Sequence, residues 1–364
     1  MPYKWSCMKP VLLGAVCVVA AVFSGCASVG PDNLRNGRLP YNDAILATSD
    51  EQLLQNIVRL RFDDSVGFLT VSSITANISV KASGLANVVV GTPGAYGPGN
   101  AIPFVGSVST EQNPTVTYTP VTGDRLMRQF MGETPVDLVI LLMNSSFNQG
   151  QLWKTLVRRV NQIGNPEFLD PPAIEADVRF TEITALISEL HRKGSLHWVR
   201  LAGAQTGHAL TLHSYSPARS REVARLLELL GVRGPAREGA DVIMPIEFSV
   251  GVPTPGSISI ETRSLIQLMQ LAAAGIALPA ELEPTSRSFP PTGPAGRDIR
   301  IQSSATRPAN TRLATEYGNR WYYIDAADQS SKQWFFTLQL LSNAQLPDKS
   351  LGLTPLLTIP SSGR

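Results

Sequence analysis

The sequence predicts an α+β fold in which antiparallel hairpins carry helices layered on a sheet. Three observations lead to this prediction. Residues 70–82 and 104–119 alternate between apolar and polar side chains, which is the period of a half-buried strand. Residues 49–62 and 176–192 carry apolar side chains at helical spacing. From residue 195 onward the order strand, turn, strand, helix recurs three times.

The first 25 residues have the organisation of a secretory signal peptide. Lys4 and Lys9 flank the start of an uncharged apolar run at 11–23, and two small residues follow that run. The run is shorter than the roughly 20 residues that a membrane-spanning helix needs. The last residue of the run and the three that follow it read Phe-Ser-Gly-Cys, end at Cys26 and resemble the bacterial lipobox. An ordinary cleaved signal with a coincidental cysteine is the alternative.

We therefore expect fatty acyl chains, such as palmitate, on Cys26 after export and cleavage. Several acyl chains on one cysteine anchor a protein firmly, whereas a single chain binds a bilayer only marginally. Ala27 follows the cysteine, and the absence of Asp at that position favours the outer membrane over the inner one. The expected location is the outer membrane, with the folded part facing the periplasm and the membrane contacted through the N-terminal lipid.

Charge and cysteine content exclude several classes of function. Without Lys4 and Lys9, which leave with the signal, the chain carries 29 basic and 29 acidic side chains. That neutral balance argues against a nucleic acid partner and against attraction to anionic lipid. Cys7 and Cys17 also lie in the signal, so the mature chain has no further thiol for a disulfide or a soft metal site.

Residues 26–43 are rich in Gly, Pro, Asn and Asp, and they are predicted to be a tether. A helix follows over 49–62, preceded by a doubled capping-box pattern in which Thr48 and Ser49 stand three residues before Glu51 and Gln52. The helix and the hairpin after it open a predicted N-terminal domain over 44–165.

The alternating stretches 70–82 and 104–119 predict an extended hairpin around a loop rich in Gly and Pro. The simpler interpretation packs this hairpin into the domain's own sheet. The alternative is a hairpin that several copies contribute to a shared sheet or an oligomeric pore.

Two helices complete the N-terminal domain, one beginning at Asp124 and the other at Pro135. A proline-containing break at 165–172 suggests the internal boundary, so a second α+β domain is predicted over 173–364. It opens with the helix at 176–192, whose apolar stripe consists of Phe180, Ile183, Ile187 and Leu190.

Three strand–strand–helix units follow in the predicted second domain. The first has strands at 195–202 and 208–215 and a helix from 217 that ends at Gly231. The second has strands at 242–251 and 257–262 and a helix at 263–274 that ends at Gly275. The third has strands near 298–303 and 319–325 and a helix that begins at Asp328. A last apolar run at 353–359 is expected to add only an edge strand, because prolines interrupt it.

All four histidines fall within residues 191–213. If the turn of the first unit centres on Gln205, His197 lies directly opposite His213 on the same face of the sheet. Two imidazoles are weak candidates for a metal site without a third ligand, so we expect no bound metal and no other cofactor. Partly exposed strand histidines are the simpler interpretation.

The densest aromatic stretch is the other candidate site. Its members form a candidate patch for a ligand or a partner such as a glycan or a peptide: Trp321, Tyr322, Tyr323, Asp325 and Asp328. A central strand followed by a helix, with Asp328 as the N-cap, is the simpler interpretation.

Three segments of the chain together resemble a family of uncharacterised bacterial outer-membrane lipoproteins. They are ATSDEQLLQNIVRLR at 47–61, PTVTYTPVTG at 114–123 and WYYIDAADQSSK at 321–332. The resemblance implies an envelope location and a shared fold. It implies no activity, so no functional residue follows from it.

The mature chain lacks the nucleophile elbow, the zinc-protease helix and the phosphate-binding loop that would indicate common enzyme classes. The sequence therefore favours a non-enzymatic scaffold or interaction subunit that binds an envelope protein or further copies of itself. The alternatives are an oligomeric pore or assembly component that uses the 70–119 hairpin, and an envelope enzyme or a glycan- or peptide-binding module.

Overall fold

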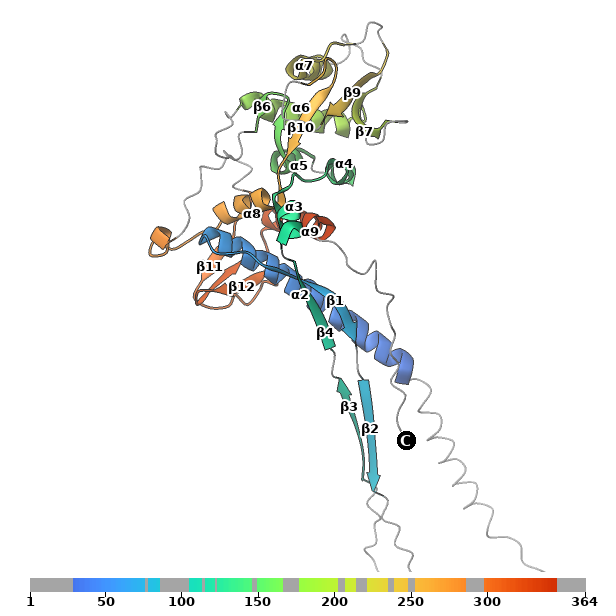
Figure 1. Ribbon diagram of the computed structural model, residues 1–364, viewed down its shortest axis with the longest axis vertical. Coiled ribbons are helices and arrows are strands. Elements are labelled where there is room, and N and C mark those ends of the chain that lie inside the picture. Colours follow the sequence, from blue (N-terminus) through green and yellow to red (C-terminus); the bar gives the residue numbers. More distant parts are fainter. Residues whose placement is uncertain are drawn as a thin grey trace, which may run out of the picture. The chain divides into compact units, whose positions relative to one another are not determined.

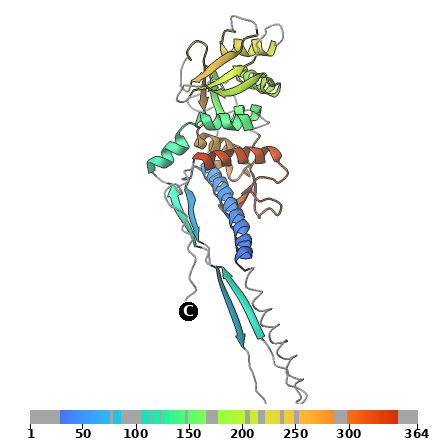
Figure 2. The same ribbon diagram turned by 90° about the vertical axis from the view of Figure 1, so that its right-hand side faces the viewer.

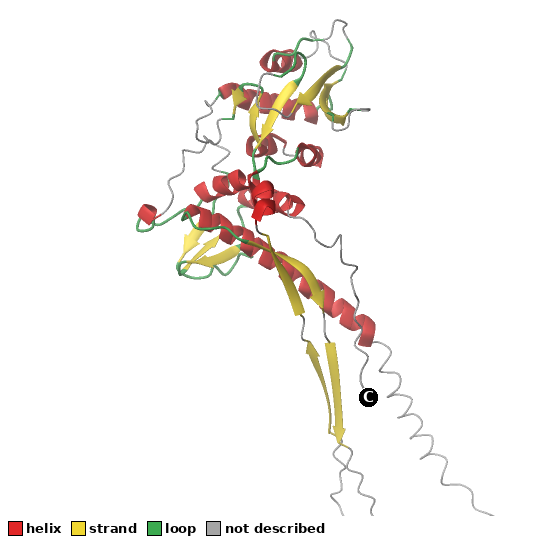
Figure 3. Cartoon of the chain, viewed as in Figure 1, coloured by secondary structure: helices red, strands yellow, loops and turns green. Residues whose placement is uncertain are grey.

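The computed structural model describes residues 29–75, 78–85, 105–112, 115–121, 123–145, 149–165, 177–201, 207–213, 221–234, 239–247, 253–285 and 298–345 (Figure 1). Within these ranges helices and antiparallel strand pairs occur together with one mixed sheet, so the predicted α+β class is confirmed (Figure 3). The signal segment and Cys26 lie outside the described residues. Among the helices described, none is both long enough and apolar enough to cross a membrane.

The chain divides into two compact units. Unit 1 comprises residues 1–48, 71–119 and 348–364, and unit 2 comprises residues 49–70 and 120–347. The boundary expected between 165 and 173 falls inside unit 2, because strands from both sides of it pair in one sheet.

Helix α2 spans Val29–Arg61, so the helix predicted at 49–62 is present but begins twenty residues earlier. The tether predicted at 26–43 is therefore wrong from residue 29 onward. Once a helix has formed, each added residue needs no new nucleus, and a weak helical sequence can extend it even with Pro40 inside. The predicted apolar stripe is buried in unit 2: Leu53, Leu54, Ile57, Val58 and Leu60.

The capping box expected at Thr48 and Ser49 is also absent, because both residues lie within α2. The Thr48 hydroxyl donates to the carbonyl oxygens of Ala44 at 2.9 Å and Ile45 at 3.1 Å. A Thr side chain inside a helix commonly bonds back to the preceding turn in this way.

The predicted hairpin is confirmed, but each long strand is divided into two. Its strands are β1 (Phe68–Thr75), β2 (Ile78–Leu85), β3 (Val105–Gln112) and β4 (Thr115–Val121). β2 and β3 pair antiparallel over all 8 residues of each strand, and β1 pairs with β4. Within the described residues, β2 and β3 form a two-stranded sheet of their own and do not join the large sheet of unit 2.

The large sheet of unit 2 has six strands in the order β6-β5-β10-β9-β8-β7. These strands are β5 (Val157–Val160), β6 (Ile163–Gly164), β7 (Leu196–Arg200), β8 (His208–Leu212), β9 (Val242–Glu247) and β10 (Ile258–Thr262). All neighbours are antiparallel except β9 and β10, which are parallel. β5 and β6 precede the expected boundary, yet β5 pairs with β10.

The two strands of the second predicted unit, β9 and β10, are therefore parallel and do not form a hairpin. The residues at the end of β9 show how this arrangement is built. Ile258 of β10 pairs with Ile246 and Ser259 with Glu247, so β10 begins where β9 ends and continues in the same direction. The Glu247 carboxylate fixes this start, because it accepts a hydrogen bond of 2.6 Å from the Ser257 hydroxyl and bonds the Thr254 backbone N–H.

Helices α6 (Val178–Arg192) and α7 (Arg221–Leu230) pack on each other, and α6 also packs on α5 (Gln149–Leu156) and β7 (Figure 2). The predicted stripe of α6 is fully buried, and Gly231 ends α7 with a φ of 68°, as its sequence position predicts. The stripe shares its core with apolar side chains from alternate positions of the sheet: Leu196, Trp198, Leu210, Leu212, Val242, Met244 and Ile246.

The remaining helices are α3 (Gly123–Met131), α4 (Val136–Ser145), α8 (Leu265–Ala274) and α9 (Gln329–Gln345), with a short 3-10 turn at Glu283–Thr285. Gly275 is the C-cap of α8, as predicted. A second sheet of unit 2 has the order β11-β13-β12, with β11 at Gln302–Ser304, β12 at Ala314–Tyr317 and β13 at Arg320–Tyr323. The third predicted unit thus forms its own sheet, and it contains one strand, β12, that the sequence pattern did not predict.

Candidate functional site

A buried ion cluster lies where β5 meets β10. The side chain of Glu261 on β10 is 7% exposed, and one of its oxygens lies 2.6 Å from Nη1 of Arg158. Nε of Arg159 lies 3.7 Å from the other oxygen. The strand register shifts between Glu261 and Thr262, and this irregularity brings both arginines of β5 within reach of the same carboxylate.

Glu133 extends this cluster from the segment between α3 and α4. Its backbone forms an isolated antiparallel β-bridge with that of Ser264. Burial raises the pKa of Glu133, the negative charge of Glu261 raises it further, and the positive charge of Arg158 opposes both effects. Glu133, which lines a pocket, therefore keeps its proton more readily than a carboxyl group in water does.

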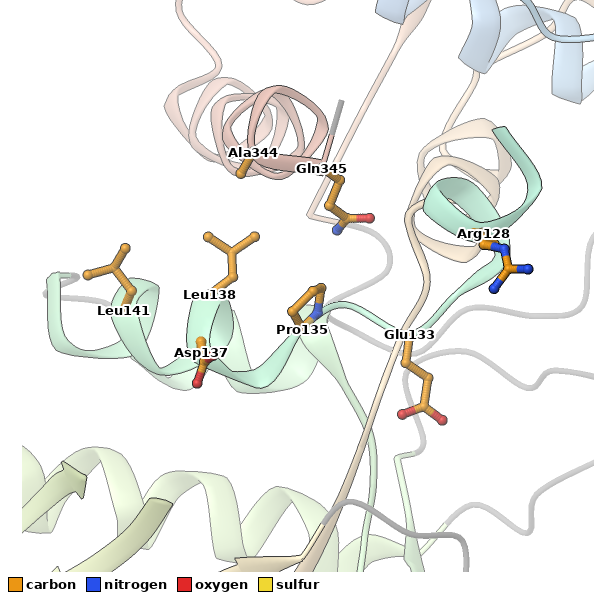
Figure 4. A pocket seen from close by; sticks show the side chains of 8 residues that line it. All are labelled: Arg128, Glu133, Pro135, Asp137, Leu138, Leu141, Ala344 and Gln345. Carbon is orange, nitrogen blue, oxygen red and sulfur yellow. The ribbon is translucent and has the colours of Figure 1, made fainter. Parts of the chain in front are cut away.

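That pocket has a volume of about 520 Å³ and lies between α4 and the end of α9 (Figure 4). Leu138 and Leu141 of α4 point toward Ala344 and Gln345 of α9 and form its apolar wall. Its charged members are Arg128, Glu133 and Asp137.

Two of those charges already have partners within the chain. Arg128 Nε lies 2.7 Å from an Asp124 oxygen, and Asp137 lies 3.0 Å from Nε2 of His208. An apolar wall with paired charges at its edge suits the binding of another surface. Among the described residues that line this pocket there is no nucleophile with an adjacent base.

A second hollow of about 340 Å³ lies beside α9 and is lined by α5 as well as by the end of α4. Among the described residues that line it, none is charged; they are Leu142, Ser145, Gln151, Leu152, Thr155, Ser330, Gln333, Trp334, Phe336, Thr337 and Leu340. A third hollow of about 390 Å³ lies beside α9 and is lined by Asp50, Lys332 and, again, Phe336. Burial raises the pKa of Asp50 to about 6.

The structure brings the predicted histidines together, but in a different register. His197 pairs with Thr211, so the turn is displaced and His213 lies two residues beyond the position directly opposite. The two rings are still neighbours, with centroids 5.0 Å apart, because a shift of two residues keeps them on one face.

The sequence pattern missed the acidic partner of this pair, since Nδ1 of His213 lies 3.0 Å from Asp241. His191 adds a third ring at a centroid distance of 6.2 Å from His197. Across the described ranges, no three or more His, Cys, Asp or Glu side chains are placed to hold a metal ion.

The aromatic stretch is divided between core and surface. Tyr322 is 1% exposed and packs edge-on against Phe62, so it does not belong to a surface patch. Trp321 and Tyr323 are half-buried; Arg307 lies 5.0 Å from the ring centroid of Trp321.

The two acidic residues of this stretch cap local structure. An oxygen of Asp325 accepts the Ala327 backbone N–H at 2.8 Å, and Asp328 accepts that of Ser331 at 3.1 Å. Burial opposes ionisation of Asp328, but the hydrogen bonds from Ser331 and the charge of Arg300 outweigh it and lower its pKa. Asp328 thus has the N-cap geometry expected for the start of α9.

Comparisons of the chain with protein-family models, with curated proteins and with solved structures find no match.

Proposed function

We propose that the chain is a lipid-anchored, non-enzymatic assembly subunit of the bacterial outer membrane that faces the periplasm. The sequence supports the anchor at Cys26 and the export signal before it. The resemblance to outer-membrane lipoproteins supports the same location.

The observation that carries the assembly role is the β2–β3 hairpin of unit 1. In the described part of the chain each of these strands pairs only with the other, which leaves the outer backbone edge of each without a neighbouring strand. A two-stranded sheet is at best marginally stable in water, and an open edge is a template for a further strand. We infer that strands of other copies or of an envelope partner complete this sheet.

Two variants with opposite effects on the hairpin test this role. In the closed-hairpin variant, Asn-Gly replaces residues 86–104 and joins the paired ends Leu85 and Val105 by a two-residue turn. In the hairpin-less variant, a Gly/Ser linker replaces residues 78–112. Native mass spectrometry of the detergent-solubilised protein should find the same assemblies for the parent and the closed-hairpin variant. The hairpin-less variant should lose the assemblies that the hairpin builds. Equal assembly in all three, or a strictly monomeric parent without an envelope partner, would refute the role.

The location has its own test. Cys26→Ser should prevent acylation and maturation at the lipobox, so the variant should keep its signal segment and remain the larger, unacylated precursor. Processing and acylation identical to those of the parent would contradict the anchor and leave the hairpin experiment unaffected.

A further inference from the structure

Three of the four histidines of the chain gather at one end of the six-stranded sheet. His191 lies in the last turn of α6, His197 near the start of the edge strand β7, and His213 directly after β8. The ring centroids of His197 and His213 are 5.0 Å apart, and those of His191 and His197 are 6.2 Å apart. The fold thus brings side chains that bind metal ions into one small region of unit 2.

The hydrogen bonds of the two closest rings determine which of their nitrogens carries the proton. Nε2 of His197 lies 3.0 Å from the carbonyl oxygen of Gly194, and Nδ1 of His213 lies 3.0 Å from a carboxylate oxygen of Asp241. A carbonyl or carboxylate oxygen only accepts, so both of these ring nitrogens donate. In the neutral rings the lone pairs are therefore on Nδ1 of His197 and Nε2 of His213.

This pattern of hydrogen bonds is the one that metal-binding histidines have. Such a ring almost always donates its other N–H to a carboxylate or a backbone carbonyl, which fixes the tautomer and orients the ring. Asp241 reaches His213 because β8 and β9 pair at Leu212 and Val242, the residues next to them in the chain. The side chains of His213 and Asp241 are 46% and 45% exposed, so an ion can reach this ring from the solvent.

The separation of the two rings fits one ion held between them. A histidine nitrogen binds zinc at about 2.0–2.1 Å and lies about 1.1 Å from its own ring centre, so the ion is about 3.2 Å from each centroid. Centroids that are 5.0 Å apart then subtend an angle of roughly 100° at the ion. That angle lies between the square-planar and the tetrahedral values, the two geometries that Cu²⁺ and Zn²⁺ prefer.

We propose that Nδ1 of His197 and Nε2 of His213 bind one divalent transition-metal ion, such as Cu²⁺ or Zn²⁺, and that Asp241 positions His213. Within the described ranges no group of three or more His, Cys, Asp or Glu side chains is placed to hold an ion, so water completes the coordination. Such a site is open and exchanges its ion, unlike a closed structural zinc site. It lies wholly in unit 2 and is independent of the lipid anchor and of the hairpin of unit 1.

Copper binding to the detergent-solubilised full-length protein, measured by titration calorimetry, tests the site. His197→Gln and His213→Asn each replace a ring N–H by an amide N–H and remove the nitrogen that would bind the ion. We expect one Cu²⁺ per chain in the parent and at least tenfold weaker binding in either variant. His191→Asn is the matched control, because its amide keeps the donor to the Leu196 carbonyl oxygen, and it should bind Cu²⁺ within twofold of the parent. Equal affinities in all four proteins, or no binding to the parent, would overturn the proposal.

Electron paramagnetic resonance of the Cu²⁺-loaded protein supplies a readout that a change in folding alone does not produce. The parent should show couplings to two imidazole nitrogens, and either ligand variant should show one. Asp241→Asn should keep both couplings and bind about tenfold more weakly, because it retains the acceptor and loses the charge. Cu²⁺ should also bind more tightly than Zn²⁺. A single imidazole nitrogen in the parent, or two in His197→Gln, would overturn the assignment of the ligands.

Discussion

At the scale of single residues, Asp50 gives unit 2 a specific dependence on pH. Its carboxylate accepts a hydrogen bond from the Gln339 amide, and burial raises its pKa from 3.8 to about 6. Between those two values the unfolded chain loses this proton while the folded chain keeps it. The free energy of unfolding therefore falls as the pH rises from about 4 to about 6, and the loss persists above pH 6.

Asp50→Asn retains an acceptor for Gln339 and removes the titration. Urea unfolding should find this variant about 1 kcal/mol more stable than the parent at pH 7.5, an amount already reduced for solvent screening of a half-buried group. Near pH 4 the two proteins should be nearly equal. A difference that is the same at both pH values would show that Asp50 does not titrate between them.

Arg263 is a second residue with a large expected effect, because it is 0% exposed. Its Nη1 donates to the carbonyl oxygens of Lys154 at 2.9 Å, Thr155 at 3.0 Å and Val157 at 3.3 Å, where α5 ends. Arg263→Met fills the same space but leaves these buried acceptors without that donor. We expect a loss of about 3 kcal/mol in the free energy of unfolding, measured by urea denaturation. Arg225→Met, which removes only surface ion pairs, is the control and should have little effect.

At the scale of elements, two amide side chains join α2 to β1. Asn56 donates to the Gly67 carbonyl at 2.7 Å and accepts the Gly67 N–H at 3.1 Å. Gln52, one turn earlier, makes the same pair of bonds to Leu69 at 3.2 and 2.8 Å. The amides thus satisfy the backbone groups of Gly67, just before β1, and of Leu69 within it, as a neighbouring strand would.

Asn56 is 1% exposed, so its replacement should cost more than that of the half-buried Gln52. Asn56→Leu should lower the free energy of unfolding by about 2 kcal/mol, because both backbone groups of Gly67 lose their partner. Asn56→Asp keeps the acceptor and should lie between the parent and Asn56→Leu in urea denaturation. Equal losses for Asn56→Leu and Gln52→Leu would contradict this role for burial.

The same scale shows what the sequence could and could not predict. Helix α6 was predictable because Phe180 and the rest of its stripe repeat at helical spacing. Strand β5 was not, because its two central residues are Arg158 and Arg159, and the Glu261 carboxylate that pairs with both lies on a strand a hundred residues away. The direction of β10 was equally hidden, since alternation is the same in parallel and antiparallel strands.

The candidate site was missed for a related reason. Helical spacing predicts the buried stripe of α9 and says nothing of the residues outside that stripe, of which Phe336 is one. The three consecutive aromatic residues did carry a signal, because one of them had to face outward. Nothing in the sequence placed α4 beside that face, which depends on tertiary packing.

At the scale of the whole molecule, the division into two units predicts that the hairpin can be removed without unfolding unit 2. Of the described residues, every member of the buried apolar core lies in 49–70 or 120–347. The hairpin-less variant should therefore unfold in urea with a free energy within about 0.5 kcal/mol of the parent's unit 2 transition, since distant changes without shared contacts are nearly additive. Amide hydrogen exchange of α6 and β8 should be unchanged as well. A lower transition midpoint or faster exchange in those elements would mean that the hairpin stabilises unit 2, and that assembly and folding in this chain are coupled.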